Sequence, residues 1–500
     1  MAIPENVVIP ENANAIERFA ADELIRYIKM MTDRKLNLKS RHSDNAIYIG
    51  CLPESANALG DILLSEMSSL HKDGFVIRDI KGTPIIYGKT PRASMYGVYT
   101  YLQMLGARWY FPGAEFIPKK DDIYLKGVNI KESPDIDHRS IVIHFWETSF
   151  NDWIDFAAKT RLNAIHLHSD DGISQMPHLI ESRGLEYNVR RHFFGDEYSL
   201  SDNNSIERDK ALLVDYISKL PYEIGEFFLW PADVRLKLLN DSRELPLPDA
   251  ILMFTNEVSK AINTARTSGR LSFLDYWSTW GVPENTKPLE SVFLEIAPIQ
   301  RCFSHSLDDP ECPVNAKEIA PVIDGLVDVF PASESHVLEY WLDASLFGRG
   351  KYNGLSGRMP QIGQIIKQDI RYYKSRGLNK ISTFAVGLNR DYLSKYSSPG
   401  IFQYPALLWD NDYNLESELL NFCQNFYGDR SIADAFSLME KLDPGDTKAD
   451  EWEALRNRLS RSEMIIKEIE KATTNDDHAE RLGKLSEEIN HVRTWINSLV

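Results

Sequence analysis

The chain has 500 residues, of which 43% are hydrophobic and 26% are charged, ordinary values for a globular protein with a large core. Its formal net charge of −17 argues against a nucleic-acid partner, because phosphate binding requires a basic face. No apolar run approaches the ~20 residues that a membrane helix needs, so we expect no membrane association. The N-terminus shows no signal-peptide pattern. These features predict a cytoplasmic protein, or an exported one whose signal has been removed.

The cysteine spacing predicts no zinc site. None of Cys51, Cys302, Cys312 and Cys423 forms a CxxC pair. Cys302 and Cys312 are close enough in sequence to pair, but we expect free, buried thiols. We predict neither a metal nor a cofactor.

Residues 1–132 have the pattern of a small α+β domain. Short apolar runs predict strands at 7–10, 46–50, 74–79 and 84–88. Between the first two, residues 11–32 carry apolar side chains at the helical period. A second helix is expected to end at Gly106, and residues 107–118 are an aromatic-rich loop or strand.

Residues 133–430 alternate short apolar runs with helical segments, which is typical of β/α units and a parallel sheet. The eight candidate strands are 140–145, 164–168, 185–189, 225–229, 271–276, 291–296, 336–341 and 381–386. Eight such units favour a closed (β/α)8 TIM barrel of the α/β class as the catalytic domain. A doubly wound open sheet is the alternative, but no glycine-rich phosphate turn follows the first strand.

Residues 431–500 predict a helical C-terminal region. Residues 451–471 and 477–499 have the pattern of two amphipathic helices in a hairpin. We expect this hairpin to cap the barrel. Contact with a second copy of the chain, giving a homo-oligomer, is the alternative.

Tryptophans gather after the predicted strands, where a TIM barrel places its active site. Six of the ten do so: Trp146, Trp230, Trp277, Trp280, Trp341 and Trp409. An indole offers a flat apolar face to the CH groups of a sugar ring. We predict that Trp230, Trp277, Trp280 and Trp341 line sugar subsites, with ordinary core packing as the alternative.

Carboxylates occupy the same predicted rim. Cleavage of a glycosidic bond needs two of them, one to protonate the leaving oxygen and one to attack the anomeric carbon or activate water. We predict Glu295 and Glu339 as the first pair, with Asp233 and Asp343 in reserve. A lone acid at a strand end more often forms a salt bridge or caps a helix.

Basic and imidazole side chains complete the predicted site. His168 and His192 are candidates to orient sugar hydroxyls, and Arg301 to bind substrate or to pair with Glu295. His166, His168 and Asp170 could instead bind a metal. Local spacing marks no further ligand, so this reading is the weaker one.

Two stretches near the N-terminus and several in the barrel resemble known families. Residues 92–99 (RASMYGVY) and 105–112 (LGARWYFP) are similar to the N-terminal domain that precedes the barrel in alpha-glucuronidases and beta-hexosaminidases. The barrel resembles domain of unknown function 4838, part of which is glycoside hydrolase family 163. The matching stretches are 163–168 (NAIHLH), 192–194 (HFF), 229–233 (LWPAD), 293–298 (FLEIAP) and 338–343 (LEYWLD).

This resemblance implies glycoside hydrolysis, with a beta-N-acetylglucosaminide or a related glycan as substrate. The family often shows Asn-Asp-Gly after the fourth strand, where this chain has Ala232-Asp233-Val234, and clustered cysteines downstream that are absent here. The leading hypothesis is a glycosidase acting through paired carboxylates. The rival is a non-catalytic carbohydrate-binding protein on the same barrel.

Overall fold

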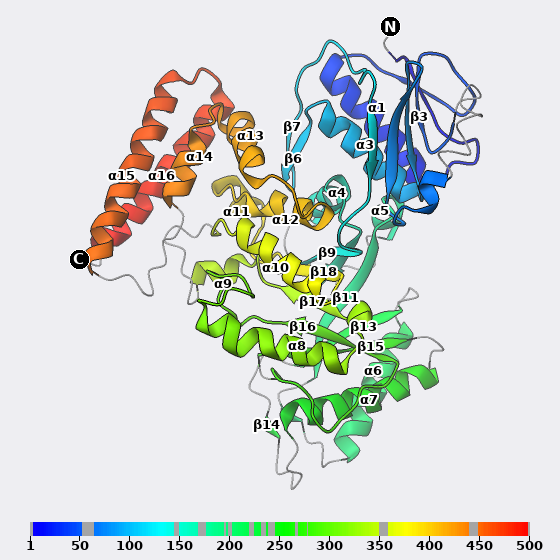
Figure 1. Cartoon of the computed structure of the whole chain (residues 1–500), viewed down its shortest axis with the longest axis vertical. Coiled ribbons are helices and arrows are strands. Elements are labelled where there is room, and N and C mark those ends of the chain that lie inside the picture. The colour runs from blue at the N-terminus through cyan, green and yellow to red at the C-terminus, as the bar shows by residue number, and fades with distance from the viewer. Residues whose placement is uncertain are drawn as a thin grey trace.

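The computed structural model describes the chain from residue 4 to residue 498. The gaps in that description are residues 53–64, 145–149, 169–176, 195–196, 199–202, 220–224, 232–236, 239–245, 266–268, 278, 350–358 and 440–448. Figure 1 shows three parts in chain order: a sheet with helices, a barrel, and a helical C-terminal region. This order agrees with the predicted α/β architecture.

The N-terminal part is a six-stranded sheet in the order β2-β1-β3-β5-β4-β8. Its strands are β1 (Asn6–Val8), β2 (Asn37–Lys39), β3 (Ala46–Ile49), β4 (Phe75–Ile80), β5 (Thr83–Gly88) and β8 (Asn129–Glu132). Helix α3 (Pro91–Met104) packs on β4 and β5, and α1 (Ala15–Thr32) packs on α3. A capping box fixes the start of α1. Glu17 N donates to Asn14 Oδ1, and Asn14 N donates to the Glu17 carboxylate.

The predicted aromatic stretch forms a hairpin of β6 (Arg108–Phe111) and β7 (Ala114–Phe116). Gly113 turns this hairpin with a φ of +78°, a conformation that glycine adopts without steric cost. Tyr110 and Phe111 then pack edge-on against Phe422, which belongs to the C-terminal helices. The hairpin therefore ties the N-terminal part to the end of the chain.

A closed barrel of eight parallel strands follows, as predicted (Figure 1). Its strands are β9 (His138–Ile143), β10 (Ala164–Leu167), β11 (Glu186–Phe194), β13 (Glu226–Pro231), β15 (Arg270–Tyr276), β16 (Val292–Ala297), β17 (His336–Glu339) and β18 (Lys380–Phe384). Each predicted strand coincides with one of these. Strand β11 runs further than expected, and β17 ends two residues earlier. A two-stranded sheet of β12 (Glu197–Tyr198) and β14 (Lys237–Leu238) lies in the loops.

Helices alternate with the barrel strands. They are α4 (Phe150–Lys159), α5 (Pro177–Ser182), α6 (Asn203–Lys219), α7 (Leu247–Ala265), α8 (Ala320–Val329), α9 (Ala344–Arg349), α10 (Gly363–Ser375), α11 (Arg390–Lys395) and α12 (Gly400–Trp409). Two single turns, η3 (Asn315–Ile319) and η4 (Ala332–Glu334), flank α8. The buried faces of strands and helices form one continuous apolar core.

The C-terminal helices are α13 (Leu415–Tyr427), α14 (Ile432–Met439), α15 (Ala449–Ala472) and α16 (Asp476–Ser498). Helices α15 and α16 form the expected hairpin and pack on α14 and α13 (Figure 1). Their contact with a second copy of the chain stays a prediction, as do the domain boundaries at 132 and 430. Among the described residues, no helix is both long and apolar enough to cross a membrane.

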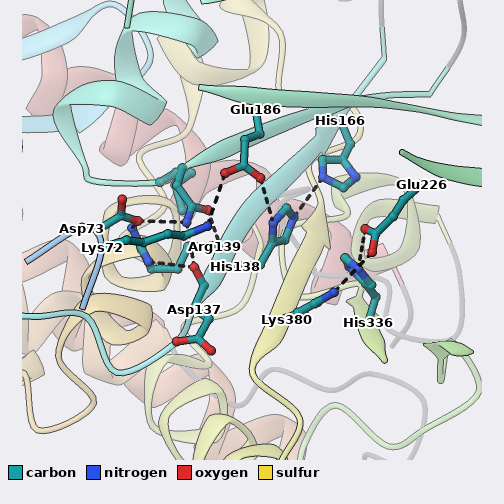
Figure 2. A network of polar contacts seen from close by, with 12 residues as sticks. Lys72, Asp73, Asp137, His138, Arg139, His166, Glu186, Glu226, His336 and Lys380 are labelled. Carbon is teal, nitrogen blue, oxygen red and sulfur yellow. Dashed lines mark hydrogen bonds and ion pairs between the residues drawn. The ribbon is translucent and has the colours of Figure 1, made fainter. Parts of the chain in front are cut away.

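Polar and charged side chains gather at the amino end of the barrel, where the rings of Phe228 and Phe293 pack against His336. The first residue of six strands is polar or charged: His138, Glu186, Glu226, Arg270, His336 and Lys380. Glu226 accepts from His336 Nε2 at 3.0 Å and from Lys380 Nζ at 3.3 Å, and His138 Nε2 lies 3.1 Å from His166 Nε2 (Figure 2). Polar groups at this end of a TIM barrel serve stability rather than catalysis.

The same network reaches the N-terminal part through Asp73. Its carboxylate accepts from Arg92 Nε at 2.9 Å, Arg139 Nη2 at 2.8 Å and Asn163 Nδ2 at 3.1 Å. Asp73 and Arg139 are both fully buried. Burial would raise the pKa of Asp73, but the two guanidinium groups lower it to about 2. This ion pair joins the N-terminal sheet to the first barrel strand.

Candidate active site at the carboxyl end of the barrel

A pocket of about 250 Å³ opens where the barrel strands end. Every barrel strand, or the loop that follows it, contributes to the lining, which consists of His144, His168, His192, Trp230, Leu274, Tyr276, Ile299, Leu338, Tyr340, Asp343, Ser345, Phe384 and Val386. This is the position at which TIM barrels carry their active sites.

Aromatic rings form the walls of the pocket. The ring of Phe384 lies 5.4 Å from that of Tyr340 and 5.7 Å from that of Trp230, and Tyr340 stacks on Tyr276 at 6.4 Å. Trp277, which was predicted to line a sugar subsite, follows Tyr276 directly and is 50% exposed, but it is not among the residues that line the pocket. A cavity with flat apolar walls and polar groups among them suits a sugar ring, which has CH groups on its faces and hydroxyls at its edge.

Three histidines contact one another on the pocket wall. The ring of His168 lies 4.3 Å from that of His144 and 5.3 Å from that of His192. Burial lowers the pKa of His144 to about 4 and that of His168 to about 3. The neighbouring imidazole of His192 also lowers both pKa values, by charge repulsion. At neutral pH, His144 and His168 are therefore uncharged imidazoles that can donate and accept hydrogen bonds.

Asp343 is the carboxylate that lines the pocket among the described residues. It directly precedes α9, and its Oδ1 accepts from Ser345 N at 2.9 Å, Ser345 Oγ at 2.6 Å and Leu346 N at 3.2 Å. These bonds cap the helix, which is the structural role expected of a lone acid at a strand end. Burial nevertheless raises the pKa of Asp343, because it outweighs the hydrogen bonds that lower it.

Glu295 lies inside the barrel beneath the pocket and does not line it. Its side chain is fully buried, 2.8 Å from Arg190, and accepts from Trp230 Nε1 at 2.7 Å. Burial raises the pKa of Glu295 and lowers that of Arg190. Glu295 thus supports a wall of the pocket through Trp230.

Glu339 lies outside the barrel, between β17 and α10. It accepts from Arg301 Nη1 at 2.8 Å and from Tyr373 Oη at 2.6 Å, and Arg301 also binds Asp369 at 2.7 Å. All of these side chains are fully buried. Arg301 pairs with Glu339 and Asp369 rather than with Glu295.

Strand register keeps Glu295 and Glu339 apart. Glu295 is paired with His336 across β16 and β17, and both side chains face the barrel interior. Glu339 is three positions further along β17, so it points to the opposite face of the strand. The structure does not bring this predicted pair together around a shared cavity.

The other predicted site residues have different positions. Trp230, His168, His192 and Asp343 meet at the pocket. Trp341 is buried against Tyr404 and donates to Asp369, and Trp280 packs on the core with its Nε1 donating to Glu318 O. His166 lies below the pocket beside His138. Asp233 and Asp170, as well as Trp146, lie outside the described residues.

Sequence reasoning missed several pocket residues. Tyr276 ends a predicted strand, and His144, Tyr340 and Phe384 lie within predicted strands, close to their carboxyl ends. Aromatic side chains at strand ends are the signal that identifies these residues. A pattern of tryptophans and carboxylates alone does not include them.

Two family models match the chain. The model described as Glycosyl hydrolase family 67 N-terminus matches residues 1–101, and the one described as Domain of unknown function (DUF4838) matches residues 235–436. The resemblance expected from the motifs of both regions is confirmed.

Curated relatives match over limited stretches. The chain is 25% identical over 163 residues to a beta-hexosaminidase of Porphyromonas gingivalis, which covers 30% of this chain and 19% of that protein. It is 30% identical over 106 residues to alpha-glucuronidase A of Emericella nidulans, which covers 20% of this chain and 12% of that protein. The matched stretches therefore span less than a fifth of either relative.

Solved structures of similar fold extend over nearly the whole chain. A family GH115 4-O-methyl-alpha-glucuronidase with specificity for decorated arabinogalactans aligns with a TM-score of 0.68 at 11% identity, covering 99% of this chain and 72% of that one. A GH138 enzyme targeting pectin rhamnogalacturonan II aligns with a TM-score of 0.62 at 11% identity, covering 98% and 68%. At these identities the likeness shows the fold.

Proposed function

We propose that this protein is a glycoside hydrolase whose active site is the pocket at the carboxyl end of the barrel. The observation that carries the proposal is the position of the buried Asp343 carboxyl beside the aromatic wall of Tyr340 and Phe384. Such a pocket can hold a sugar ring flat and present an acid to its edge. The names of the matched relatives and the fold neighbours support the same class of reaction.

Asp343 is proposed as the general acid. A carboxyl must keep its proton near neutral pH to protonate the leaving oxygen, and burial raises the pKa of Asp343 in that direction. The three donors described on Asp343 all reach Oδ1. This arrangement directs Oδ2 to the substrate.

A second group must stabilise the positive charge that develops at the anomeric carbon. We propose Asp233, because it follows Trp230 by three positions and Trp230 lines the pocket. The predicted pair of Glu295 and Glu339 is reassigned to positioning. Glu295 holds Trp230, and Glu339 holds Arg301.

The substrate class that we propose is a beta-N-acetylglucosaminide or a related glycan. An N-acetyl group can itself attack the anomeric carbon, in which case the enzyme needs one acid and a group that orients the acetamide. The uncharged His144 and His168 are suited to bind sugar hydroxyls beside it. A pocket with a single described carboxylate also fits a protein that binds the sugar without cleaving it.

The test is turnover on a panel of chromogenic glycosides that includes beta-N-acetylglucosaminides and alpha-glucuronides. We expect the unmutated protein to cleave at least one of them and Asp343→Asn to lose at least about 100-fold in kcat. Asp429→Asn is the matched control, because Asp429 is half-buried and also accepts from a backbone N–H two residues ahead, Ser431 N, but is not among the residues that line the pocket. Sugar affinity without turnover in the unmutated protein would instead establish the binding protein.

A further inference from the structure

The loop that follows β16 brings two cysteines and a histidine together. The ligand atoms of Cys302, His305 and Cys312 all lie within 4.8 Å of one another, and Cys302 Sγ is 3.3 Å from His305 Nδ1. Both cysteines are free thiols. The spacing of the three residues, Cys-x2-His-x6-Cys, contains no CxxC pair, so it does not match the usual sequence pattern of a zinc site.

These separations are close to those of a tetrahedral zinc site. With Zn–S bonds of about 2.3 Å and Zn–N bonds of about 2.0 Å, two ligand atoms of such a site lie about 3.5–3.8 Å apart. Two thiolates and an imidazole are ligands that zinc prefers over hard cations such as magnesium.

The backbone around the three ligands is fixed by one buried amide. Asn315 Nδ2 donates to Cys302 O at 2.9 Å, to His305 O at 3.0 Å and to Ser306 O at 3.0 Å, while its Oδ1 accepts from Cys302 N at 2.9 Å. Asn315 N also donates to Cys312 Sγ at 3.4 Å. Asn315 is fully buried. The side chain of Asn315 thus positions Cys302 and His305 while its backbone N–H contacts Cys312, and such groups around the ligands are what the second shell of a metal site provides.

A second fixed point comes from Arg301, whose Nη2 donates to His305 O at 3.0 Å. Arg301 is itself held by two buried carboxylates, those of Glu339 and Asp369. The loop therefore has its ligands preorganised before any ion arrives, which lowers the entropy lost on binding.

We propose that Cys302, His305 and Cys312 form a zinc site in the loop after β16, with a fourth position open to solvent. Cys312 is buried, Cys302 is half-buried and His305 is exposed, so an ion can enter from the His305 side. The site steadies the rim of the pocket, because Ile299 of the same loop lines it and Phe303 packs edge-on against Phe347 of α9.

The test uses the full-length protein, reduced and freed of metal, and titrated with Zn2+ and with Co2+. We expect one zinc per chain, a thiolate-to-cobalt charge-transfer band, and a rise in the unfolding temperature on adding zinc. Cys302→Ser, Cys312→Ser and His305→Asn should each weaken zinc binding at least ten-fold and abolish the rise. Cys51→Ser is the matched control, since Cys51 is a half-buried free thiol in the N-terminal part, and it should bind zinc as the unmutated protein does.

A variant of Asn315, which bonds to the residues that carry the ligands, gives an independent measurement of zinc affinity. Asn315→Asp keeps the size of the side chain but replaces its donor, so we expect zinc affinity to fall by about 10–100-fold. Circular dichroism identifies variants that do not fold, and the Cys51→Ser comparison remains valid without them. The proposal is overturned if zinc and cobalt bind the double variant of Cys302 and Cys312 as tightly as they bind the unmutated protein, or if neither ion binds the reduced, unmutated protein.

Discussion

Trp230 donates its indole N–H to Glu295 Oε2 at 2.7 Å. This hydrogen bond links the lining of the pocket to the buried ion pair of Glu295 with Arg190. The indole face belongs to the pocket wall, whereas the carboxylate is fully buried against Arg190. Glu295 thus contributes to the pocket only by holding Trp230.

Glu295→Gln tests this role. The change leaves the guanidinium of Arg190 buried beside a neutral amide, and such an uncompensated charge costs about 3–5 kcal/mol of unfolding free energy. Urea unfolding followed by circular dichroism measures that loss. Unchanged stability together with lost turnover would return Glu295 to the catalytic role that the sequence suggested.

Glu339→Gln should be milder than Glu295→Gln, although both glutamates are fully buried. Arg301 keeps Asp369 at 2.7 Å when Glu339 is neutralised, and the amide oxygen can still accept from Tyr373. We expect a loss of unfolding free energy below about 3 kcal/mol, the lower bound for breaking a buried pair. The same urea experiment compares the two variants side by side. An equal or larger loss in Glu339→Gln would contradict this account of the charges.

Ser345→Ala should move the pH profile of catalysis. The Ser345 hydroxyl donates to Asp343 Oδ1 at 2.6 Å and lowers the pKa of that carboxyl. Without it the pKa of Asp343 rises further, so the basic limb of kcat/KM moves to higher pH. Ser394→Ala, in which an exposed serine of α11 loses a bond to Asp391 O, is the control and should leave the limb in place. A shift to lower pH would exclude Asp343 as the acid.

Stability should fall as the solution is acidified, because of the charged network at the amino end of the barrel. Burial lowers the pKa of His336 from 6.5 to about 4, so the unfolded chain takes up this proton first as the pH falls from 6.5 to about 4. Glu226 adds to the effect below pH 4.5. Burial would raise its pKa, but His336 and Lys380 hold it well below its usual range, so its contribution is lost as it protonates.

His336→Gln should make the free energy of unfolding less dependent on pH between pH 6.5 and about 4. Urea midpoints at pH 7.5, 6 and 5 would give a slope smaller by up to about 1.4 kcal/mol per pH unit than in the unmutated protein. The amide of the new side chain can still donate to Glu226. His178→Gln, at an exposed position of α5, is the control. An unaltered slope would mean that His336 does not carry the effect.

The barrel could be predicted from sequence because buried parallel strands leave short apolar runs, and every predicted strand was found. The sequence does not predict which face of a strand each side chain lies on. Leu338 and Glu339 of β17, and Tyr340 directly after it, lie between a buried interior and a buried helix layer, so neither face shows a polar pattern. The inward positions of Leu338 and Tyr340, and hence the outward position of Glu339, follow only from the register with β16.

Only part of the candidate active site could be predicted from the sequence. Trp230, His168, His192 and Asp343 end or follow strands and do meet at the pocket. Trp341 and Arg301 also follow strands, but their partners, Tyr404 and Asp369, come from helices distant in the sequence. Long-range pairing of this kind leaves no local signal. The domain boundaries and the roles of Asp233 and Asp343 stay predictions.

The Asp73 carboxylate bears on whether the barrel can be expressed without the N-terminal sheet. A fragment that starts at residue 133 would keep Arg139 and Asn163 but lose the only described anion that both of them bind. Its first barrel strand would then begin beside an orphaned guanidinium, in a place that water does not reach in the intact chain. We therefore expect the barrel not to fold stably when it is expressed alone, because the sheet that precedes it supplies a buried charge that the barrel needs.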